Sequence, residues 1–168
     1  MGEKFPIILL QTIVYLLLQL FFLKDVALFN RAVCLIYIMP ILLVPANAKP
    51  WQFMLFAFAT GLLADLGYAT GGVHTGACVL IGFIRPHLLG LLVPTGGYDT
   101  SMLSIDAISW RWFLLYSSIM VFIHHFALFM LEAFSFTFFA QTILSTLASS
   151  LFTLAALLIF QLLFYRRS

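Results

Sequence analysis

GLLADLGYATGGVHTGACVLIGFIRPHLLGLLVP, from Gly61 to Pro94, is the stretch that decides the fold of this chain. It contains the end of one apolar segment, a short polar turn and a second apolar segment. Asp65, His74 and Arg85 stand inside this apolar sequence. An ionisable side chain at the centre of a bilayer costs roughly 2.5–3.5 kcal/mol, so such residues are rare there and mark functional sites. Each of the three is therefore a candidate functional residue.

The composition of the whole chain is that of a membrane protein. Of its 168 residues, 64% are hydrophobic and only 8% are charged, and the mean hydropathy is +1.12. Soluble domains carry about a quarter of charged residues. The net charge of +2 is too small to indicate a nucleic-acid partner. Apolar segments follow one another from Phe5 to Tyr165, which leaves no room for a separate soluble domain.

We expect an all-α integral membrane protein with six transmembrane helices in a single domain. About 20 apolar helical residues are needed to cross the hydrocarbon layer. The second segment is shorter and contains Pro40 and Pro45, which predicts a kinked or tilted helix. The expected spans are residues 5–23, 31–46, 51–67, 72–93, 110–132 and 137–165.

The positions of lysine and arginine predict how these spans are oriented. Six spans place both termini on the same side of the membrane. That side carries five cations and the opposite side two, so the positive-inside rule puts both termini in the cytoplasm. The five are Lys4, Lys49, Arg111, Arg166 and Arg167, and the two are Lys24 and Arg31.

Two stripes of polar side chains lie on otherwise apolar segments. Residues three or four positions apart share one face of a helix. In lipid, such a face packs against another helix, where its polar groups find partners. We expect packing for both stripes, and contact with a ligand stays open for the first. The stripes are Gln11, Tyr15 and Gln19 in the first segment, and Thr142, Ser145, Ser149 and Thr153 in the last.

Asp65 and His74 are expected to lie at a similar depth near the outer surface, because a tight turn separates their segments. We predict that their side chains pair, joined in one polar cluster by Glu132 and by His124 or His125. Separate solvation of each group is the alternative. Asp65 lies near a helix C-terminus, the negative end of the helix dipole, so it needs a partner. That partner is a cation, a proton, or the N–H groups at the start of the next helix.

Arg85 lies eleven residues beyond His74, about 16 Å further along the helix and on the same face. Two interpretations are open. Arg85 lies in the inner half of a cavity or partner groove, or it extends to the cytoplasmic surface and pairs with Asp99, Asp106 or a lipid headgroup.

The sequence contains no recognisable catalytic or metal-binding motif. It lacks a nucleophile elbow, a phosphate-binding glycine loop, HExxH and CxxC. His124 and His125 are adjacent, so on a helix they point about 100° apart and cannot chelate one metal together. Cys34 and Cys78 are expected to be buried thiols. We predict a protein without enzymatic activity, metal or cofactor, with an intramembrane enzyme that uses Asp65 and His74 as the alternative.

The pattern of Gly61, Asp65, Gly71, Gly72 and His74 resembles the MreD family, the rod shape-determining membrane proteins. The family pattern is a glycine, an acidic residue four positions later, and a hinge of small residues that opens the next helix. The resemblance covers nearly the whole chain. Three further stretches are similar to the Bacteroidetes-type branch of the family: FIRPHLL at 83–89, RWFLLY at 111–116 and HHFALFMLEAFSF at 124–136.

The resemblance implies a scaffold of the cell-elongation complex in the bacterial cytoplasmic membrane. Such proteins pack against the transmembrane helix of MreC and help to couple MreB filaments to the glycosyltransferase RodA and its transpeptidase partner. It also implies a fold like that of substrate-binding subunits of energy-coupling-factor transporters, so a small-molecule-binding subunit is the alternative function. The candidate binding residues are Gly61, Asp65, Gly71, Gly72, His74 and Arg85, with membrane lipids as further partners.

Overall fold

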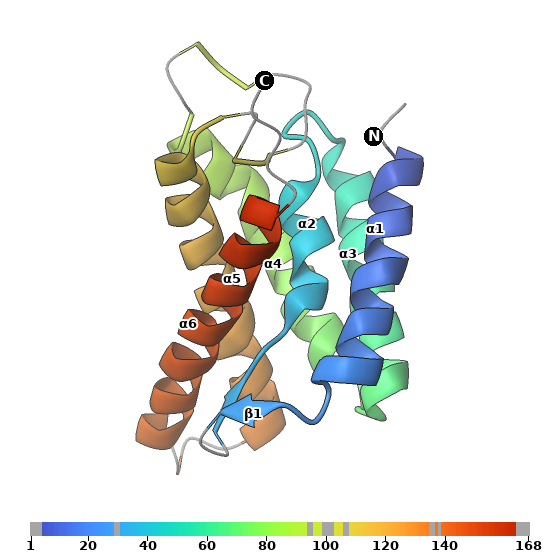
Figure 1. Cartoon of the computed structure of the whole chain (residues 1–168), viewed down its shortest axis with the longest axis vertical. Helices are drawn as coiled ribbons and strands as arrows, with labels where there is room; N and C mark the ends of the chain where they lie inside the picture. The colour runs from blue at the N-terminus through green and yellow to red at the C-terminus, as the bar shows by residue number, and fades with distance from the viewer. Residues whose placement is uncertain are drawn as a thin grey trace.

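The computed structural model is mostly helical, with its long helices side by side along one axis (Figure 1). It describes residues 5–28, 31–93, 96–98, 103–105, 108–134, 137 and 139–163. The long elements are α1 (Phe5–Leu18), continued by the π-helix η2 (Gln19–Leu23), then α3 (Pro50–Tyr68), α4 (Val73–Leu91), α5 (Trp110–Ala133) and α6 (Phe139–Leu163). These bounds lie within two residues of the predicted ones.

Three stretches among the described residues are long and apolar enough to cross a membrane: Phe5–Leu23, Trp110–Ala133 and Phe139–Leu163. The outer surface of the bundle also carries many exposed large apolar side chains, of which Leu91 and Phe21 are examples at 82% and 77% exposure. A water-soluble monomer rarely exposes such a continuous apolar surface. The fold is consistent with a membrane protein.

The prediction of a kinked or tilted helix over residues 31–46 is wrong, because most of this stretch is not α-helical. This stretch contains β2 (Ala32–Val33), which pairs antiparallel with β1 (Ala27–Leu28), then a 3-10 turn η3 (Ile36–Ile38) and the short helix α2 (Met39–Leu43). The prolines explain where α2 begins and ends. Pro40 stands in its first turn, where a missing N–H costs nothing, and Pro45 follows its C-cap residue, Val44.

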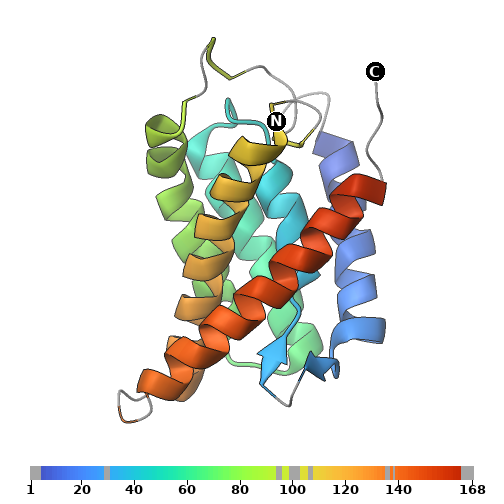
Figure 2. The same cartoon turned by 60° about the vertical axis from the view of Figure 1, so that its left-hand side comes forward.

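This irregular segment is the centre of the core. Residues from Leu35 to Val44 are almost completely buried, with Ile36, Tyr37, Ile38 and Met39 at 0% exposure. It lies between α1 and α6, and Figure 2 shows α6 crossing obliquely in front of it. Backbone that is not helical has unpaired N–H and C=O groups, and in a dry interior these need other partners.

The hydroxyl stripe of α6 supplies part of those partners. The N–H of Val33 donates to Ser149 Oγ at 3.0 Å, and the N–H of Leu35 donates to Thr153 Oγ1 at 3.1 Å. Thr142, Ser149 and Thr153 are buried, and Ser145 is half-buried. The prediction that this stripe packs inside the protein is confirmed, although its partner is irregular backbone rather than a helix.

From the polar stripe of the first helix, Gln19 also supplies partners to this segment. Gln19 is fully buried in η2, and its Oε1 accepts from the N–H of Ile36 at 2.7 Å. Its Nε2 donates to the carbonyl of Cys34 at 2.9 Å and to the hydroxyl of Tyr68 at 2.7 Å. One glutamine side chain therefore ties the irregular segment to both the first helix and α3, which confirms packing as the role of this residue.

At Gly61 the backbones of α3 and α4 approach closely. A Cβ there would lie 2.6 Å from the Cα of Thr75 and 2.8 Å from the carbonyl oxygen of His74. Both are backbone atoms, so α4 itself would have to move. In the turn that follows, Gly72 has φ of +96°, a conformation that L side chains rarely adopt, while Gly71 has free space around it.

We expect Gly61→Ala to destabilise the protein by about 1–3 kcal/mol, because the added methyl group forces α3 and α4 apart. Gly90→Ala is the matched control, since Gly90 is also helical and a Cβ there meets nothing within 4 Å. The control should be neutral or slightly stabilising. Melting temperatures of both variants in the same detergent test this, and equal melting temperatures would contradict the close approach.

Candidate functional site

Asp65 closes the turn between α3 and α4 by accepting four hydrogen bonds. Its Oδ1 accepts from the N–H of His74 at 3.0 Å and from the hydroxyl of Thr70 at 2.5 Å. Its Oδ2 accepts from the N–H and the hydroxyl of Thr75, at 2.8 and 2.5 Å. The carboxylate is only 4% exposed. It therefore caps the N-terminus of α4, where unpaired N–H groups and the positive end of the helix dipole favour an anion.

The predicted side-chain pair between Asp65 and His74 is wrong. Asp65 contacts the backbone of His74, and the imidazole of His74 hydrogen-bonds with Tyr37 instead. The physical reason is that the start of α4 already offers the carboxylate a full set of donors. Glu132, also predicted for this cluster, is exposed at the end of α5.

A second polar cluster, centred on Tyr37, lies in the middle of the core. The Tyr37 hydroxyl is 2.9 Å from Nδ1 of His74 and 2.9 Å from Nε2 of His124. Cys78 Sγ lies 3.8 Å from the same Nε2, and the Tyr68 ring packs on His74 with centroids 4.6 Å apart. The cluster thus joins η3, α3, α4 and α5, and it includes one of the two histidines predicted to lie near His74.

The Tyr37 hydroxyl has one proton for two imidazoles. It donates to one ring and accepts from the other, so the facing nitrogens of His74 and His124 are in opposite protonation states. Such an arrangement can relay a proton. Tyr37 and His124 are 0% exposed, and His74 is 5% exposed, so the cluster is closed off from solvent. Within the described residues, no group of His, Cys, Asp or Glu side chains is placed to hold a metal ion.

His125 has a separate role from its neighbour. Its Nδ1 donates to the carbonyl of Val121 at 2.9 Å, and its Nε2 accepts from the Thr153 hydroxyl at 3.1 Å. Thr153 is the residue that accepts from the backbone of Leu35. His125 therefore positions the hydroxyl that satisfies the irregular segment.

Arg85 is buried, with only 2% of its side chain exposed. Its Nε donates to the Tyr116 hydroxyl at 2.8 Å, and its Nη2 donates to the carbonyl of Val44, the residue that ends α2. The guanidinium carbon lies 4.4 Å from the centre of the Phe53 ring. Of the two interpretations of Arg85, the structure bears out the cavity and not a side chain extended to the surface.

The cavity beside Arg85 has a volume of about 280 Å³. Two aromatic donors hold the adjoining end of α4: the Tyr98 hydroxyl donates to Leu89 O at 2.7 Å, and Trp112 Nε1 donates to Leu92 O at 2.6 Å. Partial burial raises the pKa of Tyr98, so this phenol keeps the proton that it donates. The predicted partners Asp99 and Asp106 lie outside the described residues.

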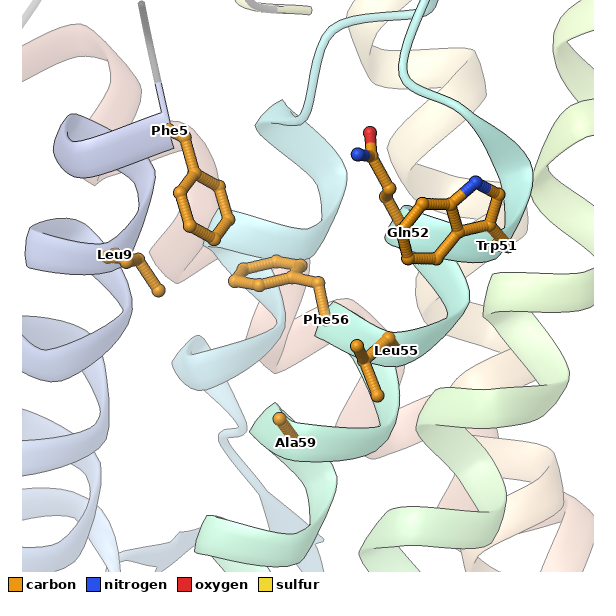
Figure 3. Close-up of a pocket in the computed structure, with 7 residues that line it drawn as sticks. All are labelled: Phe5, Leu9, Trp51, Gln52, Leu55, Phe56 and Ala59. Atoms are coloured by element: carbon orange, nitrogen blue, oxygen red, sulfur yellow. The ribbon is translucent and has the colours of Figure 1, made fainter. Parts of the chain in front are cut away.

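A larger groove lies on the outside of the bundle between α1 and α3. Its volume is about 490 Å³, and its lining is mostly apolar. Figure 3 shows Phe5 and Leu9 of α1 facing Phe56 of α3 across it, with Ala59 at one end. The groove contains no charged side chain among its lining residues, so it suits a hydrocarbon chain or an apolar helix rather than a polar substrate.

Asp65, His74 and Arg85 were predicted from the sequence, but Tyr37 and Tyr116, the two phenols that bind His74 and Arg85, were not. The available signal was a tyrosine hydroxyl inside an apolar run, because such a group needs a buried partner. The candidate glycines Gly61, Gly71 and Gly72 lie at the helix contact and the turn, and they line no cavity described above. No protein-family model, curated protein or solved structure matches this chain.

We expect Asp65→Asn to destabilise the protein by about 1–3 kcal/mol, because the amide turns N–H groups toward donors that are already buried. Asp25→Asn, at an exposed aspartate, is the control and should change little. A double-mutant cycle scored by melting in detergent then identifies the partner. Asp65→Asn should couple with Thr75→Val by about 0.5–3 kcal/mol, and more strongly than with His74→Gln. Stronger coupling to His74→Gln would instead support a side-chain pair between Asp65 and His74.

Proposed function

We propose that this chain is a non-enzymatic membrane scaffold of the MreD type. In this proposal it binds the transmembrane helix of MreC in the cytoplasmic membrane and helps to couple MreB filaments to RodA and its transpeptidase partner. The pattern of Gly61, Asp65 and Gly72 supports the family assignment. The observation that supports the scaffold role most directly is the apolar groove between α1 and α3.

The polar residues of the core support a binding role rather than turnover. Gln19, Asp65 and Arg85 each make at least one hydrogen bond with the backbone of a neighbouring element. The imidazoles of His74 and His124 face one buried hydroxyl. These groups fix the shape of the bundle, and a rigid bundle with an external apolar groove is what a docking partner requires.

The groove fits a single transmembrane helix by its chemistry and position. An apolar helix inserts its side chains into a groove between two helices, and small residues allow the backbones to approach. Ala59 supplies the small residue, and Phe5 and Phe56 supply the apolar walls. In this proposal, the helix that occupies the groove is the transmembrane helix of MreC.

The proposed topology has six crossings with both termini in the cytoplasm. The beginning of α1 and the end of α6 lie at the same end of the bundle (Figure 1), which agrees with an even number of crossings. The five-to-two distribution of lysine and arginine supports the cytoplasmic orientation. In this topology the irregular segment makes the second crossing inside the protein, where non-helical backbone is tolerated because lipid does not reach it.

A second candidate function is a substrate-binding subunit of an energy-coupling-factor transporter, and the cavity beside Arg85 favours it. Pockets that bind small molecules have volumes of roughly 300–1,000 Å³. At about 280 Å³, this cavity lies at the lower limit. It is better suited to a small charged group than to a whole vitamin, so the scaffold is the stronger candidate.

Cysteine cross-linking in membranes tests the scaffold proposal. Ala59→Cys places a thiol in the groove, and Ala155→Cys places one at an exposed position of α6 as the matched control. Each is expressed with MreC carrying a cysteine scanned through its transmembrane helix. The native Cys34 and Cys78 are buried and provide little background.

We expect cross-links from Ala59→Cys at MreC positions spaced three or four residues apart, and none from Ala155→Cys. That spacing is the signature of one helix face in the groove. Cross-links from Ala155→Cys alone would place the interface at α6 instead of the groove. If neither position gave a cross-link, the proposed partner would be contradicted.

A further inference from the structure

The cavity beside Arg85 contains an arginine whose hydrogen bonds are incomplete. Nε and Nη2 are used by Tyr116 and Val44, whereas Nη1 has no hydrogen-bond partner among the described residues. Within the same part of the chain, no carboxylate forms an ion pair with this guanidinium. A buried cation that lacks an anion is costly in a membrane protein, and Arg85 lacks one among the described residues, so a negatively charged ligand would stabilise it there.

The first turn of α3 adds a second positive feature at the same cavity. Pro50 occupies the first turn of this 19-residue helix and lines the cavity. Trp51 and Gln52, the next two residues, line the α1–α3 groove and not this cavity, so their N–H groups are no part of the site. What the helix start contributes is the positive end of the helix dipole, which favours an anion. Lys49 is exposed immediately before the helix.

We infer that this cavity binds a phosphate group. The bound group is a phosphate anion, which is part either of a phospholipid headgroup or of a soluble phosphate. Arginine binds phosphate through parallel N–H groups, and the orphan Nη1 offers one of them. The walls leave room because they include Ala46, Ala48 and Gly90.

The position of the cavity agrees with a ligand from the membrane surface. It lies where α3 begins and α4 ends, at the end of the bundle that also holds the start of α1 (Figure 1). Phosphates of lipids gather at the ends of transmembrane helices, where basic pockets bind their headgroups. This inference does not depend on the scaffold role, because a headgroup at Arg85 and a partner helix at the α1–α3 groove use different surfaces.

The experiment measures phosphorus NMR line broadening of two probes added to the purified full chain in a phosphate-free detergent. Dihexanoyl phosphatidic acid represents the lipid source and inorganic phosphate the soluble source, with dihexanoylglycerol as a competitor that lacks the charge. Three variants accompany the wild type. Arg85→Gln removes the cation, Gly90→Leu fills the cavity, and Arg111→Gln removes an exposed arginine as the control.

A loss of binding in Arg85→Gln alone would not distinguish a lost site from an unfolded protein, so Gly90→Leu tests the cavity a second way. A Cβ at Gly90 meets nothing within 4 Å, so leucine enters free space and leaves Arg85 in place. We expect saturable binding to the wild type and to Arg111→Gln. Both Arg85→Gln and Gly90→Leu should weaken it by about tenfold or more, the loss expected for a charge-assisted contact.

Binding of the short-chain lipid alone identifies a headgroup site, and binding of both probes identifies a site for phosphate from either source; each outcome supports the inference. Three outcomes would overturn it. These are no saturable binding to the wild type, unchanged binding to both Arg85→Gln and Gly90→Leu, and an equal loss in Arg111→Gln, which would indicate attraction by net charge alone.

Discussion

The structure depends on satisfying the backbone of the irregular segment that runs through its core. Buried N–H and C=O groups without partners are costly, and a continuous helix would have paired them internally. Because Pro40 and Pro45 limit α2 to a few residues, side chains must supply the missing partners. Gln19 does so from the first helix, Ser149 and Thr153 from α6, and Arg85 from α4. Each of these residues is polar in an otherwise apolar helix for this reason.

The same requirement explains why the ionisable residues sit so deep. Arg85 satisfies the end of α2, and the imidazoles of His74 and His124 bind Tyr37 of η3. Asp65 is the exception, because it serves the start of α4 rather than the irregular segment. The polar groups therefore form a framework that holds α3, α4, α5 and α6 around η3 and α2.

Much of this architecture could be predicted from the sequence, and the exceptions share one cause. Hydropathy located the five long helical segments closely, because their length and composition are local properties. The conformation of the irregular segment was not predicted, because it is stabilised by hydrogen bonds to side chains far away in the sequence, such as Ser149. For Asp65 the sequence left three partners open, and the structure shows the N–H groups at the start of α4 rather than the His74 side chain that was preferred. Likewise, Tyr116 lies 31 positions from Arg85, and no local pattern connects them.

The central claim is that side chains from neighbouring helices protect the backbone of the irregular segment. Hydrogen exchange of the amides of Val33, Leu35 and Ile36, measured in lipid nanodiscs, tests it most directly. The account predicts slow exchange in the wild type, as in the middle of α5, and much faster exchange at Ile36 in Gln19→Leu, because that variant removes its acceptor. Fast exchange of these amides in the wild type, or no change in the variant, would contradict the account.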